Sequence, residues 1–299
     1  MAQTVGFVPT MGALHDGHLS LVKKSLAEND LTVVSIFVNP AQFAPHEDLT
    51  SYPRTLPKDI EILENTRSPG AGSCETRYPA AVFAPTANEM YPSGIVLEIA
   101  EQKGAFVEVK GFSHQMEGQT RPTFFRGVAT VVTKLFNVIQ PTNAYFGQKD
   151  IQQALILKRL VTDLLMSHPT PQNLHIVPTG RDLTDGLALS SRNLYLSPAG
   201  RKVAPTLRQA LLAAEIAWNG GATKHETLVR AITVMDAAIR RAHREGLTAG
   251  IKLDYIEMND TKTFEVLDAQ ARKTEGSTVI LSGAFYVDKT AAHRQYSAG

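Results

Sequence analysis

Residues 5–24 have the sequence VGFVPTMGALHDGHLSLVKK, and the predicted fold can be built outward from this stretch. Residues 5–8 form a short apolar run of the length and composition typical of a buried parallel strand. The Pro-Thr-Met-Gly segment at 9–12 interrupts the run, and apolar residues then recur at helical spacing from Leu19 to Leu26. The order of strand, glycine-bearing turn and helix predicts the first half of a βαβ unit.

His15 and His18 lie where the turn is expected to become the helix, with Gly17 between them. The start of a helix offers unpaired N–H groups and a positive dipole end, and both suit a phosphate group. Gly17 allows a ligand to approach the backbone closely, and two imidazoles can donate hydrogen bonds to phosphate oxygens. By itself this short pattern is equally compatible with a helix that begins with two surface histidines. The preceding strand and turn favour a nucleotide site.

The composition is that of an ordinary globular protein, with 299 residues of which 43% are hydrophobic and 20% charged. The formal net charge of +1 gives no electrostatic reason to expect nucleic acid or an anionic membrane as a partner. The single cysteine, Cys74, excludes an internal disulfide and fits a reducing compartment. Since the sequence has neither a membrane-spanning apolar run nor a signal peptide, we expect a cytoplasmic protein.

An alternation of strands and helices continues after the first helix. We expect strands at residues 31–38, 81–84, 144–146 and 174–177, and helices around Ile60 and Leu63, at 123–140 and at 151–165. This order predicts a Rossmann-like, doubly wound parallel sheet. Residues 66–79 are expected to form a loop, and the alternating apolar residues of 95–110 an extended or hairpin segment. No GxGxxG or GxxxxGK[ST] motif follows a strand, so neither a dinucleotide site nor a P-loop has motif support.

The sequence pattern changes from alternating strands and helices to alanine-rich helices near residue 197. Residues 198–245 are alanine-rich with helical periodicity, and two strand-like runs follow at 253–258 and 278–281, with a tail after residue 287. We therefore expect a Rossmann-like domain at 1–189 and a smaller α+β domain at 190–299.

Four groups of polar residues are expected at loop ends of the large domain. They are residues 11–18, Asn39 with Gln42, residues 147–150 with Gln152 and Gln153, and residues 185–193. Lys149 can meet a phosphate, while Asp150 can either cap the next helix or hold a ribose hydroxyl. Each group alone is also compatible with an ordinary loop. Together they favour attack on the α-phosphate of a nucleoside triphosphate, which needs positioning and charge neutralisation more than covalent help.

Five segments carry a resemblance to a known family: PTMGALHDGHLSLV, SIFVNPAQF, DLTSYPRT, YFGQKDIQQ and DGLALSSRN, in this order. With them the chain resembles the pantothenate synthetases (pantoate–β-alanine ligases) over residues 5–196, and more weakly through LDYIEMND and LSGAFYV. The resemblance implies a nucleotidylyl-transferase fold with a C-terminal domain that closes over the site, in a homodimer. It also implies the reaction. ATP and pantoate give pantoyl adenylate and pyrophosphate, and the amine of β-alanine then displaces AMP.

The resemblance also implies roles for individual residues. The implied ATP site is lined by Pro9, Thr10, Met11, His15, Gly17, His18, Gly147, Lys149, Asp150, Ser190, Ser191 and Arg192. Within this set the implied catalytic residues are His18, His15, Lys149 and Arg192. Pantoate and β-alanine would be bound by Gln42, Gln153, Arg121 and Met11, and Asp59 would assist Mg²⁺. Lys58 stands at a position that is often acidic in the family.

Two other functional classes remain open. One is a different nucleotidyl transferase, such as a cytidylyltransferase or a small relative of the class I aminoacyl-tRNA synthetases. The paired amides Gln42 and Gln153, and the absence of a basic anticodon-binding segment, count against it. The other is a catalytically silent binding or regulatory protein, which predicts a damaged site. Since His15, His18 and Arg192 are all present, we prefer the ligase.

Overall fold

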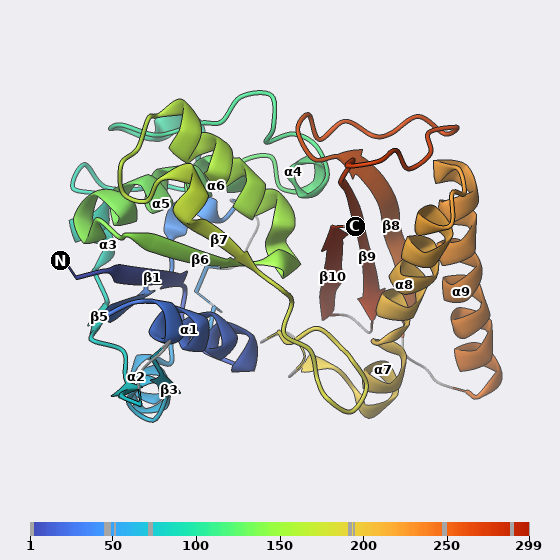
Figure 1. The fold of residues 1–299 in the computed structure, drawn as a ribbon, viewed down its shortest axis with the longest axis horizontal. Coiled ribbons are helices and arrows are strands. Elements are labelled where there is room, and N and C mark those ends of the chain that lie inside the picture. Colours follow the sequence, from blue (N-terminus) through green and yellow to red (C-terminus); the bar gives the residue numbers. More distant parts are fainter. Residues whose placement is uncertain are drawn as a thin grey trace. The chain divides into compact units, whose positions relative to one another are not determined.

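The computed structural model forms two compact units (Figure 1). It describes residues 3–44, 49–50, 52–70, 74–190, 193, 195–246, 250–287 and 290–298. The first unit comprises Met1–Gly147 and Ile151–Pro178, and the second comprises Gln148–Asp150 and Thr179–Gly299. Each unit groups residues that mainly contact one another. The expected division of function between residues 1–189 and 190–299 stays a prediction.

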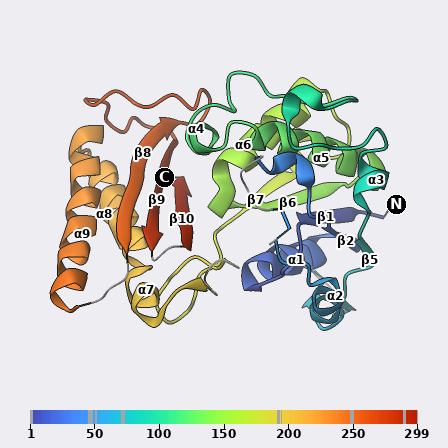
Figure 2. The same cartoon turned by 180° about the vertical axis from the view of Figure 1, so that it is seen from behind.

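A five-stranded parallel sheet forms the centre of the first unit, in the order β5-β2-β1-β6-β7. Its strands are β1 (Val5–Thr10), β2 (Leu31–Ile36), β5 (Ala81–Phe83), β6 (Asn143–Gly147) and β7 (Leu174–Val177). The helices that connect them are α1 (Asp16–Glu28), α2 (Leu56–Glu64), α5 (Phe124–Ile139) and α6 (Ile151–Asp163). With α1 and α2 on one face and α5 and α6 on the other, the predicted doubly wound sheet is confirmed (Figures 1 and 2).

Buried apolar side chains cover both faces of this sheet. On one face Val8, Val34 and Leu63 pack with the apolar side of α1. On the other face Phe7 meets Phe136 of α5 edge-to-face, with ring centroids 6.3 Å apart. Because Phe7 and Val8 are neighbours in one strand, they point to opposite faces, as the apolar run at 5–8 requires. Full burial of each such side chain stabilises the fold by about 1.5–3 kcal/mol.

The strand order reverses between β1 and β6, and open α/β sheets bind ligands outside the carboxyl ends of their strands at such a point. β1 pairs with β2 along its full length, whereas its register with β6 comprises only Gly6↔Asn143 and Phe7↔Ala144. The two strands are therefore not joined at their carboxyl ends, where residues 9–11 lie.

Pro9 contributes to this separation. The carbonyls of Thr4 and Thr10 accept the N–H groups of Leu31 and Phe37, so the even-numbered residues of β1 bond toward β2. The odd-numbered residues, Pro9 among them, consequently face β6. A proline has no N–H to donate, so the ladder between β1 and β6 lacks a donor at this position.

A short 3₁₀ helix, η1 (Pro40–Gln42), lies after β2 and packs closely on α5. The contact is at Gly127, where an added Cβ would lie 2.2 Å from the carbonyl oxygen of Ala41. Asn39 caps η1 by accepting the N–H of Ala41 at 3.4 Å. The glycine therefore sets how closely η1, and with it Gln42, approaches α5.

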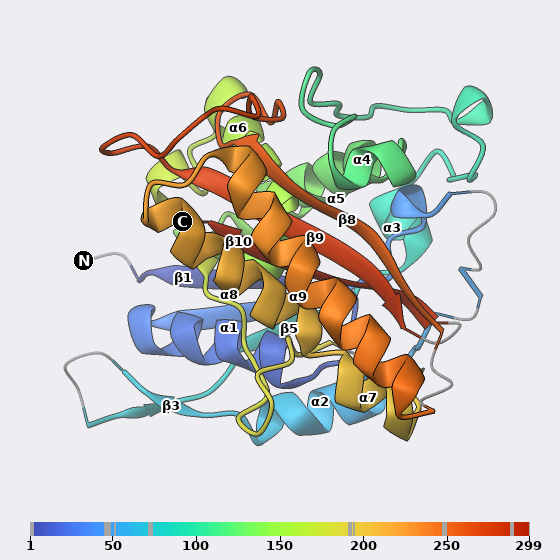
Figure 3. The same ribbon diagram turned by 90° about the vertical axis from the view of Figure 1, so that its right-hand side faces the viewer.

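The second unit contains a three-stranded antiparallel sheet with helices packed on it (Figure 3). The strands β8 (Ile251–Asp260), β9 (Val279–Val287) and β10 (Thr290–Ala298) have the order β10-β9-β8. The helices are α7 (Pro198–Val203), α8 (Thr206–Asn219) and α9 (Lys224–Arg244). Leu207, Leu211 and Phe285 belong to one core cluster, so the predicted α+β architecture is confirmed. Among the described residues, no helix combines the length and apolar character needed to span a membrane.

Three local predictions were wrong. Residues 66–79 contain a small hairpin, β3 (Ser68–Pro69) with β4 (Thr76–Arg77), which Arg77 ties to α1 by donating to the carbonyls of Leu26 and Asn29. Residues 95–110 contain only η2 (Ile99–Glu101) and irregular backbone, since Val107 bonds to Thr130 of α5 rather than to a strand. The expected tail after residue 287 contains strand β10.

Other short elements had no clear sequence signal. They are α3 (Ala87–Met90), α4 (Glu117–Thr120), η3 (Gln148–Asp150) and η4 (Pro171–Asn173). One or two turns offer too few residues for a helical period to be recognised.

The Gly127→Ala variant is expected to lower the free energy of unfolding by about 1–3 kcal/mol, because the new Cβ forces η1 away from α5. Urea unfolding measures the change. The control is Asn137→Ala, at an exposed position of the same helix, which should remain within about 0.5 kcal/mol of the original protein. Equal stability of Gly127→Ala and the original protein would contradict the close approach at this position.

Candidate active site

The loop between β1 and α1 brings both histidines to the start of α1. His15 is the N-cap, and its Nδ1 accepts the N–H of Gly17 at 3.1 Å. The rings of His15 and His18 have centroids 4.1 Å apart and are tilted by 35°. Because Nδ1 accepts a hydrogen bond, the neutral ring of His15 carries its proton on Nε2. The N–H groups of His18 and Leu19 both point to the carbonyl of His15, so the cap already bonds these first N–H groups of α1. What the start of α1 offers a phosphate is the positive end of the helix dipole and the Nε2–H of His15.

Left-handed backbone shapes the loop before these histidines. Gly12 has φ 83° and Ala13 has φ 50°, and the second value is costly for a residue with a Cβ. The carboxylate of Asp59 holds this backbone by accepting the N–H groups of Ala13 at 3.0 Å and Leu14 at 2.8 Å. Asp59 also accepts the hydroxyl of Thr55 at 3.0 Å and is 1% exposed. A buried carboxylate on α2 thus fixes the loop that precedes His15.

This geometry bears on the predicted role of Asp59 beside Mg²⁺. Both carboxylate oxygens already accept N–H groups, so they are engaged as a backbone anchor rather than as a cation site. No cluster of three or more His, Cys, Asp or Glu side chains suited to a metal ion occurs within the described ranges. The residues present do not fit a metal held by Asp59.

Thr10 has its hydroxyl turned to the protein as well. It donates to the carbonyl of Ser35 at 2.7 Å and accepts the N–H of Gly12 at 3.2 Å. The side chain is 8% exposed. Thr10 therefore joins β2 to the same loop, and any contact that it makes with a nucleotide remains a prediction.

Three of the four predicted substrate-binding residues lie together. Gln42 Nε2 is 3.0 Å from the sulfur of Met11, and the carbonyl of Gln42 accepts from the guanidinium of Arg121 at 3.2 Å. Arg121 is itself held over the ring of Phe124, with its guanidinium carbon 4.0 Å from the ring centroid. The fourth residue, Gln153, is partly buried on the first turn of α6, which starts near the carboxyl end of β6.

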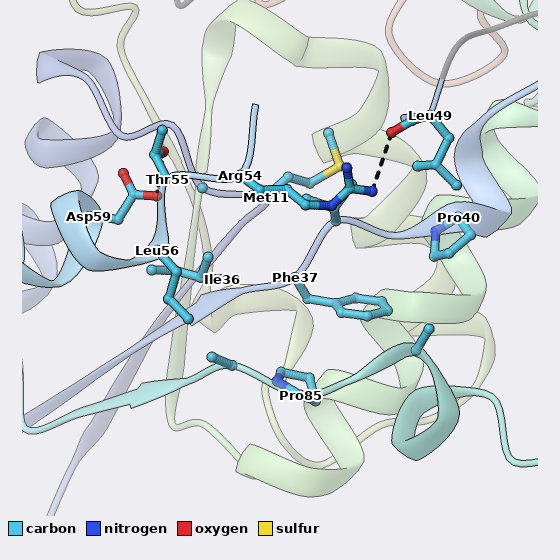
Figure 4. A pocket seen from close by; sticks show the side chains of 14 residues that line it. Met11, Ile36, Phe37, Pro40, Leu49, Arg54, Thr55, Leu56, Asp59 and Pro85 are labelled. Atoms are coloured by element: carbon cyan, nitrogen blue, oxygen red, sulfur yellow. Dashed lines mark hydrogen bonds between the residues drawn. The ribbon is translucent and has the colours of Figure 1, made fainter. Parts of the chain in front are cut away.

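A cavity of about 540 Å³ opens beside the ends of β1 and β2 (Figure 4). Its lining includes Met11, Ile36, Phe37, Arg54, Thr55 and Pro85. The guanidinium of Arg54 donates to the carbonyl of Leu49 at 3.3 Å. The volume is that of a small-molecule site, and Met11 is common to this cavity and to the group around Gln42.

The remaining predicted site residues belong to the region around β6 and to the second unit. Gly147 ends β6. In η3, Nζ of Lys149 lies 3.8 Å from Oδ2 of Asp150, and the two side chains are 27% and 55% exposed. An ion pair this long and this exposed contributes little to stability. Ser190 follows a loop closed by a hydrogen bond from Leu189 N–H to the carbonyl of Gly180 at 3.0 Å. The predicted residues Ser191 and Arg192 lie outside the described residues.

Comparisons with known proteins identify the family. A sequence model with the description Pantoate-beta-alanine ligase matches residues 1–292.

The chain belongs to the pantoate–β-alanine ligase family.

Among the relatives, the pantoate–β-alanine ligase of Saccharomyces cerevisiae is 46% identical, over 95% of this chain and 86% of that protein. The pantothenate synthetase of Herpetosiphon aurantiacus is 44% identical, over 96% and 90%. A crystal structure of pantothenate synthetase from Thermus thermophilus superposes with a TM-score of 0.78 at 38% identity, over 98% of this chain and 92% of that one. The Francisella tularensis ligase, solved with β-γ ATP and β-alanine, has a TM-score of 0.67 at 31% identity, over 99% and 89%.

These comparisons confirm the family and the ligase activity implied by the five motifs. The different nucleotidyl transferase and the silent binding protein are set aside. The roles of individual residues in this ligase stay predictions. Sequence reasoning missed the use of Asp59 as a loop anchor and did not single out Tyr91, whose hydroxyl donates to Asn39 at 2.6 Å.

The His15→Asn variant separates the two uses of His15. Asparagine is also a good N-cap, so the unfolding free energy should stay within about 0.5 kcal/mol. The ligase rate should fall by roughly 10²-fold, because the imidazole donor to phosphate is lost. His15→Ala should show the same loss of rate and a further loss of about 1 kcal/mol in stability. Full activity of His15→Asn in steady-state assays would remove His15 from the phosphate site.

The Asp59→Asn variant tests the loop anchor. Its NH₂ group must face a backbone N–H, so the unfolding free energy should fall by about 2–3 kcal/mol, with a lower ligase rate. The Mg²⁺ concentration for half-maximal activity should not change. Glu61→Gln, at an exposed position of α2, is the control. A large rise in the Mg²⁺ requirement, with stability unchanged, would restore the metal role of Asp59.

Proposed function

We propose that this ligase joins pantoate to β-alanine in two steps, through a pantoyl-adenylate intermediate. In the first step a carboxylate oxygen of pantoate attacks the α-phosphorus of ATP, and pyrophosphate leaves. In the second step the amine of β-alanine attacks the acyl carbon, loses a proton, and expels AMP. The observation that carries the proposal is the pair His15 and His18 at the N-terminus of α1, beside the point where the strand order reverses.

The start of α1 supports the first step. Negative charge on the transferring phosphate grows as the new bond forms, and the helix dipole and imidazole donors both favour that charge. The Nε2–H of His15 is one such donor, since its Nδ1 accepts the N–H of Gly17. Gly17 has no side chain to keep a ligand away from the helix start. We assign His18 the main catalytic role and His15 a supporting one. Both act by stabilising charge, and neither forms a covalent bond.

The residues around Gln42 support pantoate binding. Gln42, Arg121 and Met11 combine amide and guanidinium donors with an apolar side chain. Such a surface suits a molecule that carries a carboxylate, hydroxyls and methyl groups. Gln153 is proposed to bind pantoate from the start of α6. A donor group of Gln42, Gln153 or Arg121 is proposed to orient β-alanine.

We propose that Lys149, Asp150, Ser190, Ser191 and Arg192 complete the nucleotide site. The cations and hydroxyls among them suit the β- and γ-phosphates, and Asp150 suits a ribose hydroxyl. In this proposal residues 190–299 act as a lid. A lid matters for the chemistry because water would otherwise hydrolyse the acyl adenylate before the amine arrives.

Mg²⁺ is proposed to enter with ATP, bound to its phosphates, since the oxygens of Asp59 are engaged by backbone N–H groups. A homodimer and a cytoplasmic location belong to the same proposal. The family resemblance supports the homodimer, and the single cysteine supports a reducing compartment such as the cytoplasm. The ATP and β-alanine bound by the Francisella tularensis relative support these two substrates for this chain.

Pyrophosphate release tests the two-step route. On mixing with ATP, Mg²⁺ and pantoate, the enzyme should release pyrophosphate in a single-turnover burst without β-alanine, and turn over continuously when β-alanine is added. In His18→Ala the rate constant of the burst should be lower by about 10²-fold or more, which is the usual effect of losing a transition-state donor. Pyrophosphate release that requires β-alanine from the start would contradict a free-standing adenylation step.

A further inference from the structure

We infer that Tyr91 is a positioning residue for substrate recognition: its hydroxyl holds Asn39 in place, and Asn39 in turn orients Gln42 so that the NH₂ group of Gln42, and not its oxygen, faces the substrate. The inference rests on the proposed role of Gln42 in pantoate binding. It adds that Gln42 acts as a hydrogen-bond donor to the substrate. It identifies the recognised group as a hydrogen-bond acceptor, that is, a carboxylate or hydroxyl oxygen.

A chain of short hydrogen bonds links the three residues. The hydroxyl of Tyr91 lies 2.6 Å from Asn39 Oδ1, and Asn39 Nδ2 lies 3.1 Å from Gln42 Oε1. All three side chains are buried, with exposed fractions of 3%, 1% and 8%. Tyr91 and Asn39 are 52 residues apart in sequence, so the link is made by the fold. Buried polar chains of this kind hold a single arrangement when every member is satisfied.

Two backbone groups decide the orientation of Asn39. The carbonyl of Gly127 can only accept, and it lies 3.1 Å from Asn39 Nδ2. The N–H of Ala41 can only donate, and it lies 3.4 Å from Asn39 Oδ1. Exchanging the amide nitrogen and oxygen of Asn39 would place like groups against both. The Asn39 amide therefore has one orientation, in which its NH₂ faces Gln42.

The orientation of Gln42 follows. An NH₂ group of Asn39 needs an acceptor opposite it, so Gln42 must turn Oε1 toward Asn39. Its Nε2 then points the other way, to the sulfur of Met11 at 3.0 Å. A thioether is a weak acceptor. A substrate oxygen, from a carboxylate or a hydroxyl, is a much better one.

Contacts around its ring keep Tyr91 in place. Phe106 stacks on it, with centroids 6.4 Å apart and planes at 24°, and the Lys134 ammonium lies 4.0 Å from the Tyr91 ring centroid. Lys134 also donates to the carbonyl of Met90, next to Tyr91. Burial raises the pKa of the Tyr91 phenol, so its hydroxyl remains protonated and able to donate at neutral pH. A phenylalanine would keep the ring contacts and lose only the hydroxyl.

Tyr145 provides a matched control within the same unit. It is also fully buried, and its hydroxyl bonds to Asn29 at 2.7 Å and Glu28 at 3.0 Å at the end of α1. Neither partner is a predicted site residue. Tyr145→Phe therefore removes a buried hydroxyl of similar surroundings without touching the chain from Asn39 to Gln42.

The experiment compares Tyr91→Phe with Tyr145→Phe, measuring stability and the KM values for pantoate and ATP. We expect both variants to lose stability, and Tyr91→Phe alone to raise the pantoate KM, by about 10-fold, the scale of one buried hydrogen bond. The KM of Tyr91→Phe for ATP should remain within about twofold of the value for the unmutated protein, since the substitution removes no proposed contact with ATP. An unchanged pantoate KM in Tyr91→Phe, or an equal rise in both variants, overturns the inference.

The Gln42→Glu variant tests the donor directly, and it does not depend on how Tyr91→Phe folds. Glutamate keeps the length of the side chain but offers only oxygens, so the pantoate KM should rise by about 10²-fold from charge repulsion and the lost donor. An unaffected pantoate KM in Gln42→Glu overturns the donor assignment. The unmutated protein distinguishes the two proposals. If it does not use pantoate, the proposed function fails. If it does and both variants match it, the two-step reaction stands, while this inference and the proposed contact of Gln42 with pantoate fail.

Discussion

The carboxylate of Asp59 is the constraint on which the rest of the site depends. Asp59 lies on α2, 45 or 46 residues further along the chain than the loop that it holds. Its carboxylate accepts two consecutive backbone N–H groups of that loop, those of Ala13 and Leu14. Without it, a loop containing a left-handed alanine would leave two N–H groups unsatisfied beside the sheet. The position of His15, and so the direction in which α1 presents its N-terminus, follows from this anchor. The geometry of the proposed phosphate site thus begins with a side chain that need not touch a substrate.

Periodic patterns made much of the first unit predictable. The apolar run at 5–8, the turn and the helical spacing that follows correspond to β1 and α1, with His15 at the N-cap. Elements whose formation depends on a single long-range contact could not be predicted in this way. The β3–β4 hairpin is held by Arg77 against α1, and its local composition is that of a loop. The segment at 95–110 alternates like a strand, yet its backbone bonds to a helix.

The candidate site shows the same limit at the level of single residues. Motifs placed Gln42, Met11 and Arg121 in one site, and the structure brings them together. A sequence does not say what an acidic residue will bind, so the hydrogen bonds of Asp59 to the N–H groups of Ala13 and Leu14 could not be predicted. Nor does any periodicity connect Tyr91 to Asn39. Their pairing exists because the chain after β5 returns across the end of β2. Residue type was predictable, whereas partner choice was not.

Pro9 shows that the parting of two neighbouring strands can be specified by what a strand is unable to do. Every other residue of β1 carries an amide hydrogen, and a sheet with hydrogens at all positions tends to extend its ladders as far as both strands allow. A ring nitrogen at the one position that faces β6 near the carboxyl end stops this extension on that side, while the β2 side remains paired to Ile36. The sheet is therefore asymmetric about its first strand, closed on one side and parted on the other. The separation of β1 from β6 at their carboxyl ends is therefore encoded in the backbone itself, by one residue type at one position.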